Sequence, residues 1–260
     1  MSHSGEEPRA EPRQQRSLSF GAEAAAYERG RPSYPPEAID WLLPPDAVDV
    51  LDLGAGTGKL TTRLVERGLG VVAVDPIPEM LELLSNSLPD TPALLGTAEE
   101  IPLPDDSVDA VLVAQAWHWF DHDRAIGELR RVLRPGGRLG LVWNARDRSE
   151  PWVDEVWSIM DDVERRAPWR DHENWRDSAF RAMPGFGSLE TAEFRHTQTL
   201  SPEGVVQRVA SVSHVAVLPD AEREAVLDEV REILRTHPDA RNRAELELVY
   251  RVDCLAVKRR

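Results

Sequence analysis

The sequence predicts an α/β protein built on a parallel β-sheet, and the region after residue 48 gives three reasons for this prediction. Short apolar runs alternate there with longer segments of helical periodicity, which is typical of βα units in a parallel sheet. The runs are rich in β-branched residues, as expected for strands buried on both faces. A glycine-rich turn joins the first run to the first helix, where open α/β sheets bind ligands. We expect one doubly wound domain, because 260 residues leave little room for a second.

The first half of the domain is expected to alternate strands and helices. Strands are predicted at 48–53, 71–74, 93–95, 110–114 and 139–143. Helices are predicted at 59–67, around Met80 and between Asp121 and Arg134, where apolar residues recur at helical spacing. We expect the sequence Arg134-Pro135-Gly136-Gly137 to end the third helix sharply.

The regular alternation lapses after Asn144, and we interpret residues 145–187 as a helical cap inserted into the domain. Four of the eight tryptophans fall there, and we expect them to form the core of the cap: Trp152, Trp157, Trp169 and Trp175. The elements expected next are a strand at 189–199, a helical segment at 200–237 near the active site, and an alternating strand from Leu246 to Val252. Within the helical segment, one helix is predicted from Ser201 to Ala216 and another from Val226 to Leu234.

Composition limits the classes of partner. Lys and Arg total 31 against 46 Asp and Glu, so the formal charge is −15 and nucleic acid is not an expected partner. The single cysteine, Cys254, excludes an internal disulfide framework. No apolar run approaches the roughly 18 to 20 residues of a membrane span, and residues 1–17 read as a disordered tail without a signal peptide. These features predict a cytoplasmic protein without a membrane partner, whose residues 18–260 form one domain.

The glycine-rich turn has the form Asp52-Leu53-Gly54-Ala55-Gly56-Thr57-Gly58, and Asp75 follows 21 residues after its first glycine. A carboxylate at that distance, at the end of the second strand, is placed to accept hydrogen bonds from a ribose. A phosphate-binding P-loop is excluded, because the glycine spacing is one residue short and Leu60 follows Lys59. The dinucleotide pattern is disfavoured, because Lys59 stands where its third glycine is required. An NAD-dependent oxidoreductase is therefore the second choice.

This turn resembles motif I of class I S-adenosylmethionine-dependent methyltransferases. The resemblance extends from Phe20 to Trp143 and is to the type 11 methyltransferase group, whose members are similar to trans-aconitate methyltransferase and other small-molecule methyltransferases. It implies a Rossmann-like mixed sheet of seven strands, six parallel and the last antiparallel, with helices on both faces. It also implies S-adenosylmethionine as cofactor, S-adenosylhomocysteine as product, and in-line methyl transfer to a small organic acceptor.

The resemblance assigns roles to residues at matching positions. Asp52 is expected to hold the methionine amino group, Asp75 the ribose, and Tyr27 and Arg31 the methionine carboxylate. The turn itself is expected to pass beneath the cofactor, and the other cofactor contacts are expected from Gly54, Ala55, Gly56, Gly58, Pro76, Met80, Ala98, Glu99, Gln115 and Ala116. Thr97 replaces an aspartate that is common in the group beside the adenine. Tyr27 and Arg31 have a second interpretation, in which they only pack the N-terminal segment onto the domain.

His118 is the candidate catalytic base, because imidazole titrates near neutrality and His118 follows the fourth strand. The alternative is that His118 only packs between Trp117 and Trp119. A metal site with His122 is not expected, because Asp121 is predicted to cap the helix and so to leave the two rings unaligned. A protein that binds the cofactor without turnover, with a regulatory role, is a further alternative, and whether the chain forms a homodimer is left open.

Overall fold

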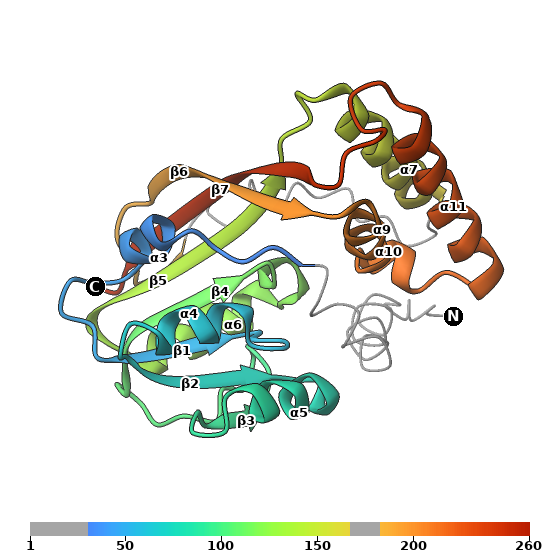
Figure 1. The fold of residues 1–260 in the computed structure, drawn as a ribbon. Coiled ribbons are helices and arrows are strands. Elements are labelled where there is room, and N and C mark those ends of the chain that lie inside the picture. The colour runs from blue at the N-terminus through green and yellow to red at the C-terminus, as the bar shows by residue number, and fades with distance from the viewer. Residues whose placement is uncertain (1–30, 167–182) are drawn as a thin grey trace, which may run out of the picture.

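The computed structural model describes residues 31–166 and 183–260. It contains one sheet of seven strands in the order β3-β2-β1-β4-β5-β7-β6 (Figure 1). The strands are β1 (Asp49–Leu53), β2 (Gly70–Asp75), β3 (Ala93–Leu95), β4 (Val108–Ala114), β5 (Leu133–Arg146), β6 (Glu190–Leu200) and β7 (Leu246–Lys258). Six strands are parallel, and β7 lies antiparallel between β5 and β6. The prediction of a seven-stranded mixed sheet is confirmed.

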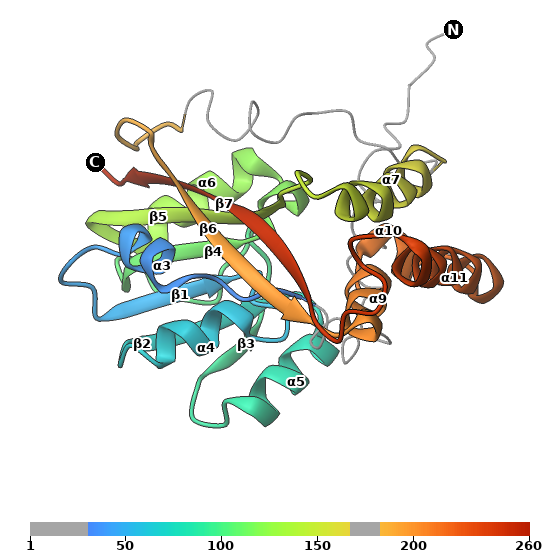
Figure 2. The same ribbon diagram turned by 45° about the horizontal axis from the view of Figure 1, so that its top comes forward.

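Helices cover both faces of this sheet. On one face α3 (Pro36–Leu42) and α4 (Lys59–Val65) pack against alternate side chains of the central strands. On the other face α6 (His122–Val132) packs against the intervening side chains. Helix α5 (Pro78–Ser87) lies beside β2 and β3, on the face of α4 (Figure 2), where its Leu84 approaches Gly58 at the start of α4. Val50 of β1 accordingly belongs to the first core, and Leu51 and Leu53 belong to the second. Burial on both faces explains why the central strands are almost wholly apolar.

The cap is a second cluster of helices with a core of its own. It consists of α7 (Pro151–Arg166), α9 (Pro202–Ala210), α10 (Ser213–Ala216) and α11 (Asp220–Thr236). Trp152 and Trp157 are buried in this core, as predicted, together with Leu246, Leu248 and Tyr250 of β7. The cap helices stand beyond the carboxyl ends of β1, β4 and β5 (Figures 1 and 2). Trp169 and Trp175, as well as Tyr27 and the predicted N-terminal tail, lie outside the described residues.

Several predicted boundaries differ from the structure, among them the end of the last strand, which runs to Lys258 instead of Val252. The single helix from Ser201 to Ala216 is wrong, because α9 ends at Ala210 and α10 begins at Ser213. The break lies at Val212, whose backbone is extended while its side chain stays in the cap core, so the apolar spacing continues across it. The sequence predicts a strand only from residue 139, after the turn at 134–137. In the structure β5 already begins at Leu133 and includes that turn, where its pairing with β4 is irregular.

The order of the strands indicates where this sheet can bind a ligand. Strands β2 and β4 pair with opposite edges of β1. The chain therefore crosses to one side of the sheet after β1 and to the other side after β4, and the two connections diverge at the carboxyl ends of these strands. In open α/β sheets, ligands bind at such a point. The glycine-rich turn and the segment around His118 both begin there, beneath the cap.

Candidate active site

The glycine-rich turn leaves β1 and enters α4 with left-handed backbone at three glycines. The φ angles of Gly54, Gly56 and Gly58 are 74°, 55° and 91°. A Cβ on Gly54 would lie 2.6 Å from the Cβ of Ala116, so this glycine allows the loops after β1 and β4 to touch. A Cβ on Gly56 would meet no atom within 4 Å. Gly56 therefore presents bare backbone to open space, as a turn that cradles a ligand requires.

Asp52 is the buried carboxylate beneath this turn. Its side chain is 0% exposed, and the Thr61 hydroxyl donates a hydrogen bond of 2.6 Å to its Oδ2. Its Oδ1 is buried and has no hydrogen-bond partner among the described residues. Burial raises the pKa of Asp52 to about 7, the Thr61 hydrogen bond opposes this shift, and the charge of Asp75 adds to it. A buried acceptor without a donor is rare and points to a cationic or hydrogen-bonding ligand.

Asp75 ends β2 and binds the same turn from the other side. Its Oδ2 accepts a hydrogen bond from the Gly56 backbone N–H at 2.8 Å, and its Oδ1 accepts one from the Ile77 N–H at 2.9 Å. Burial raises the pKa of Asp75, and these two backbone hydrogen bonds oppose the rise. The carboxylate therefore fixes the position of Gly56, and each oxygen keeps acceptor capacity for a second donor.

A pocket joins Asp52 and the glycine-rich turn to the N-terminal segment and to the loop after β4. It is lined by Arg31, Pro32, Tyr34, Asp52, Gly54, Ala55, Gly56, Thr57, Lys59, Leu60, Ala114 and Gln115. Six of the predicted cofactor residues are among them: Arg31, Asp52, Gly54, Ala55, Gly56 and Gln115. The Arg31 guanidinium also donates a hydrogen bond to the Ser211 carbonyl at the end of α9. The pocket is thereby connected to the cap.

The other predicted cofactor residues that the structure describes, Asp75 among them, do not line this pocket. Gly58 lies beside Leu84 of α5, and Ala116 lies beside Gly54. Met80 is buried against Ile77, and Pro76, the residue before Ile77, is partly exposed. Ala98 is buried. Glu99 Oε1 accepts a hydrogen bond from the Asp121 N–H, so Glu99 holds the start of α6. That contact gives Glu99 a structural role whether or not it also faces a ligand.

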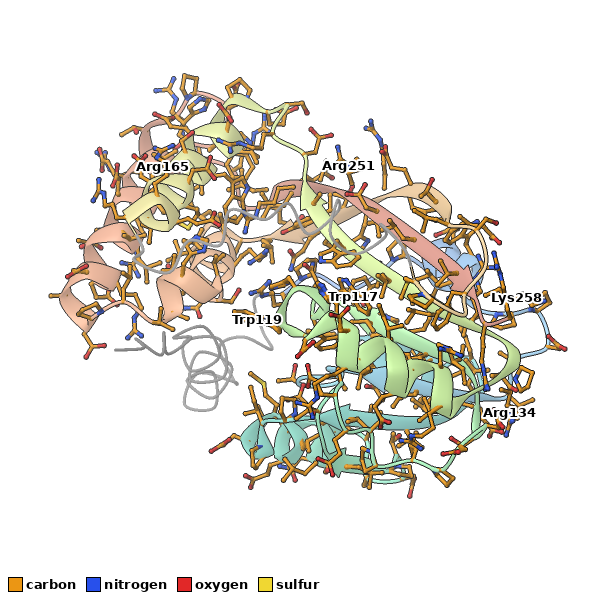
Figure 3. The ribbon with its side chains drawn as sticks, turned by 180° about the vertical axis from the view of Figure 1, so that it is seen from behind. Trp117, Trp119, Arg134, Arg165, Arg251 and Lys258 are labelled. Atoms are coloured by element: carbon orange, nitrogen blue, oxygen red, sulfur yellow. The ribbon has the colours of Figure 1, made fainter. Side chains whose placement is uncertain are left out.

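The loop after β4 carries the candidate base. Gln115 has a φ of 59°, a conformation uncommon outside glycine that often marks functional sites. Trp117 is fully buried and stacks on His122, whose Nε2 lies 3.1 Å from the Trp117 carbonyl oxygen. His118 is exposed, and its ring lies 4.8 Å from that of Trp119. Trp117 and Trp119 lie at the end of the sheet that faces the cap, and Arg134 and Lys258 lie at the opposite end (Figure 3).

The predicted helix cap at Asp121 is confirmed. Asp121 caps α6 by accepting a hydrogen bond from the Arg124 N–H, and His122 begins that helix. His118 belongs instead to the preceding 3-10 turn, Trp117–Trp119. In residues 31–166 and 183–260 no group of three His, Cys, Asp or Glu side chains is arranged to hold a metal ion.

Sequence reasoning missed several groups at the site. Thr61 and Tyr34 are buried beside Asp52 and the pocket, and Asn144 at the end of β5 binds the Ser33 carbonyl. Thr61 lies nine residues after Asp52, on the first turns of α4, so a polar residue on the buried face of that helix was the available signal. Arg146 and Arg208 were also missed; their charges act on each other, and that of Arg146 also acts on the pocket-lining Arg31. No local sequence pattern marks them, because only the tertiary fold brings them together.

Comparison with known proteins agrees with this geometry. A family described as a methyltransferase domain matches residues 51–141. An uncharacterized methyltransferase of Mycobacterium tuberculosis is 57% identical over 94% of this chain and 96% of its own length. An uncharacterized methyltransferase-like protein of Schizosaccharomyces pombe is 38% identical over 89% and 92%. The structure of a putative type II methyltransferase from Anaeromyxobacter dehalogenans superposes with a TM-score of 0.69 at 29% identity, over 87% of this chain and 97% of that one.

These relatives extend over nearly the whole chain, cap included. The chain therefore belongs to the class I S-adenosylmethionine-dependent methyltransferases, and the resemblance of its glycine-rich turn to their motif I is confirmed. Within the described ranges, none of the helices has the length and apolar character needed to cross a membrane.

Proposed function

We propose that this methyltransferase moves the methyl group of S-adenosylmethionine to a small organic acceptor by in-line displacement, in the pocket between the glycine-rich turn and the cap. The observation that carries the proposal is the buried Asp52 carboxylate, whose Oδ1 has no partner in the described structure. A methionine ammonium group is a donor of the charge and size that this oxygen requires.

The residues present fit the rest of the cofactor. We assign the ribose hydroxyls to the remaining acceptor capacity of Asp75, which binds the pocket-lining Gly56. The methionine carboxylate is assigned to Arg31, which lines the pocket together with Asp52. Gly54, Ala55, Gly56 and Gln115 supply the surface on which the cofactor lies. Ala98 and Glu99 are proposed beside the adenine, and Gly58, Pro76, Met80 and Ala116 as supports of the surrounding loops. Tyr27 keeps its proposed role as a prediction from the sequence.

When bound, the cofactor supplies a methyl group on a positively charged sulfur, which is a good leaving group. The chain's contribution is then to hold the acceptor atom in line with that bond and to exclude water, because positioning supplies much of the acceleration in such a transfer. The turn and Asp52 fix one reactant, and the cap lies where it can enclose the other. The acceptor enters as a small molecule in the cytoplasm, as the sequence predicts.

His118 is proposed as general base for acceptors that must lose a proton. His118 is exposed and follows the pocket-lining Gln115 by three residues. Its neighbours Trp117 and Trp119 lie at the end of the sheet that faces the cap (Figure 3). We expect His118→Ala to lower kcat for a proton-bearing acceptor by about 100-fold, within the range of general-base catalysis. The dissociation constant for S-adenosylmethionine should change by less than about twofold. His122→Ala is the matched control, and equal losses of kcat and cofactor affinity in His118→Ala would show a packing role instead.

Gly56→Ala is expected to weaken cofactor binding by at least about tenfold. An added methyl group strains the left-handed backbone by about 1 kcal/mol and enters the open space proposed for the cofactor. Gly68→Ala is the control, since Gly68 has a φ of 74° and nothing within 4 Å of its Cβ, but lies outside the pocket. Both variants should lose similar unfolding free energy in urea titrations. Equal cofactor affinity in the two variants would contradict the proposed position of the turn.

The activity itself is tested by product formation. Purified protein is incubated with methyl-labelled S-adenosylmethionine and a panel of small organic acceptors, and labelled product is measured together with S-adenosylhomocysteine. We expect stoichiometric formation of both with at least one acceptor. Cofactor binding without product from any acceptor would favour the cofactor-binding regulatory protein over the enzyme that we propose.

A further inference from the structure

We infer that the methyl acceptor is a small organic acid, held through a carboxylate or phosphate group by Arg146 at the end of β5. The inference rests on the proposed function, because it names the substrate class of that same site. It derives from a cluster of three arginines between the pocket and the cap: Arg31, Arg146 and Arg208.

Arg146 is a cation whose side chain forms no ion pair with any residue of 31–166 or 183–260. It is the last residue of β5, and its guanidinium lies 3.9 Å above the centre of the Trp157 ring. Its guanidinium likewise forms no hydrogen bond with a described residue, whereas its backbone belongs to the ladder between β5 and β7. The side chain is still partly exposed, so a ligand can reach it. Its five N–H groups are therefore available to an oxygen-rich anion.

Arg208 and Arg31 place further positive charge around Arg146. Arg208 on α9 donates to the Tyr250 hydroxyl and to Ser211 Oγ, and lies 5.5 Å from the same Trp157 ring. Burial, and then the charges of Arg208 and Arg31, lower the pKa of Arg146 to about 9, so it stays protonated at neutral pH. The three arginines thus form a positively charged cluster, although the chain carries 46 acidic side chains.

The acid on α7 that attracts Arg146 is already engaged by another arginine. Asp161 of α7 attracts Arg146, but its Oδ2 already accepts a hydrogen bond from Arg148. Arg148, which lies just before α7, pairs with both Asp154 and Asp161 of that helix. An anion that binds Arg146 would therefore be added to the cluster without breaking an existing ion pair.

The position of the cluster connects it to methyl transfer. Arg31 lines the pocket that also contains Asp52 and the glycine-rich turn, and it donates to the Ser211 carbonyl. Ser211 in turn hydrogen-bonds with Arg208. An acid anchored at Arg146 would lie on the cap side of the pocket, and Trp157 provides the aromatic floor beneath its anchoring cation.

Arg138 provides a matched control on the same strand. It also stacks on a tryptophan, with its guanidinium 5.0 Å from the Trp41 ring, but it pairs with Glu190 and lies far from the pocket end of β5. We compare wild type with Arg146→Met, Arg146→Lys and Arg138→Met. All four should bind S-adenosylmethionine within about twofold of one another by titration calorimetry.

Methyl transfer is then measured with matched pairs of acceptors. One arm contains small carboxylic acids with their primary amides, and the other contains phosphate monoesters with their parent alcohols. We expect turnover with members of one anionic arm, which identifies the anchoring group, and at least about tenfold lower kcat/KM for the neutral partners. Arg146→Met should lower kcat/KM for the anionic acceptor by about 10- to 100-fold, mainly through KM. Arg146→Lys should recover part of this, and Arg138→Met should stay within about twofold of wild type.

Three results would overturn the inference. These are equal use of acids and their neutral partners, equal effects of Arg146→Met and Arg138→Met, or cofactor binding with no anionic acceptor used. A separate readout follows the thermal midpoint of the protein with citrate or inorganic phosphate, which should rise in wild type and in Arg138→Met but not in Arg146→Met. If S-adenosylmethionine fails to bind while this rise persists, the proposed function fails and the anion site stands. Absence of the rise in wild type counts against the site itself.

Discussion

Replacing Asp52 with asparagine is expected to stabilise the folded protein at pH 8 while removing most of its affinity for S-adenosylmethionine. The ionised carboxylate is fully buried, and burial raises its pKa from 3.8 to about 7. The folded state therefore binds more protons than the unfolded state between these two values, so stability falls as the pH rises from about 4 to about 7. Three pKa units correspond to about 4 kcal/mol at pH 8.

Asparagine removes the charge and can still accept the Thr61 hydrogen bond. We expect the free energy of unfolding of Asp52→Asn, from urea titrations, to exceed that of wild type by about 2 to 4 kcal/mol at pH 8, and by less at pH 5. Asp49→Asn is the control on the same strand, since Asp49 is partly exposed and paired with Arg134. It should change stability by less than about 1 kcal/mol and leave cofactor affinity unchanged.

The same carboxylate predicts how cofactor binding depends on pH. Binding of an ammonium group needs ionised Asp52, so wild-type affinity for S-adenosylmethionine should fall about tenfold per pH unit below about 7 and level off above it. Asp52→Asn should bind weakly and without this dependence. A destabilised Asp52→Asn variant with wild-type affinity at every pH would show that Asp52 is a structural residue only.

Asp75→Ala is expected to weaken binding of S-adenosylmethionine by about 1.5 to 3 kcal/mol, through loss of a charge-assisted contact with the ribose. The structure adds a second reason, because the Asp75 carboxylate also accepts the Gly56 and Ile77 N–H groups and so fixes the turn. Calorimetric titration measures the change directly. Unchanged affinity would contradict the assignment of Asp75 to the ribose.

A truncated ligand separates the roles of the two aspartates. Methylthioadenosine keeps the ribose and the adenine but lacks the amino-acid portion of the cofactor. Asp75→Ala should therefore weaken its binding about as much as that of S-adenosylmethionine, and Asp52→Asn should leave it nearly unchanged. The reverse pattern would mean that the cofactor binds in the opposite orientation, with its ribose near Asp52 and its amino group near Asp75.

The sequence predicts those parts of the molecule that local patterns determine. The spacing of three glycines between Asp52 and Lys59 indicates the turn, and the structure gives each of them left-handed backbone. Asp121 before an apolar repeat indicates the start of α6, where it accepts a backbone hydrogen bond. The break at Val212 escaped prediction, because its valine keeps the apolar spacing while its backbone leaves the helix.

Long-range contacts account for what the sequence does not predict. Arg146 and Arg208 are 62 positions apart in the chain and meet only because α7 and α9 pack in one cap around Trp157. The orphaned oxygen of Asp52 likewise depends on how α4 and the N-terminal segment close over β1. Neither feature leaves a periodic or spaced pattern in the sequence.

The most direct test of the account is calorimetric titration of the protein with S-adenosylmethionine, S-adenosylhomocysteine and NAD in parallel. We predict one site per chain for each of the first two ligands and none for NAD, with both affinities reduced in Asp52→Asn and retained in Asp49→Asn. Binding of NAD alone, or binding of S-adenosylmethionine that is indifferent to Asp52, would contradict the proposed site.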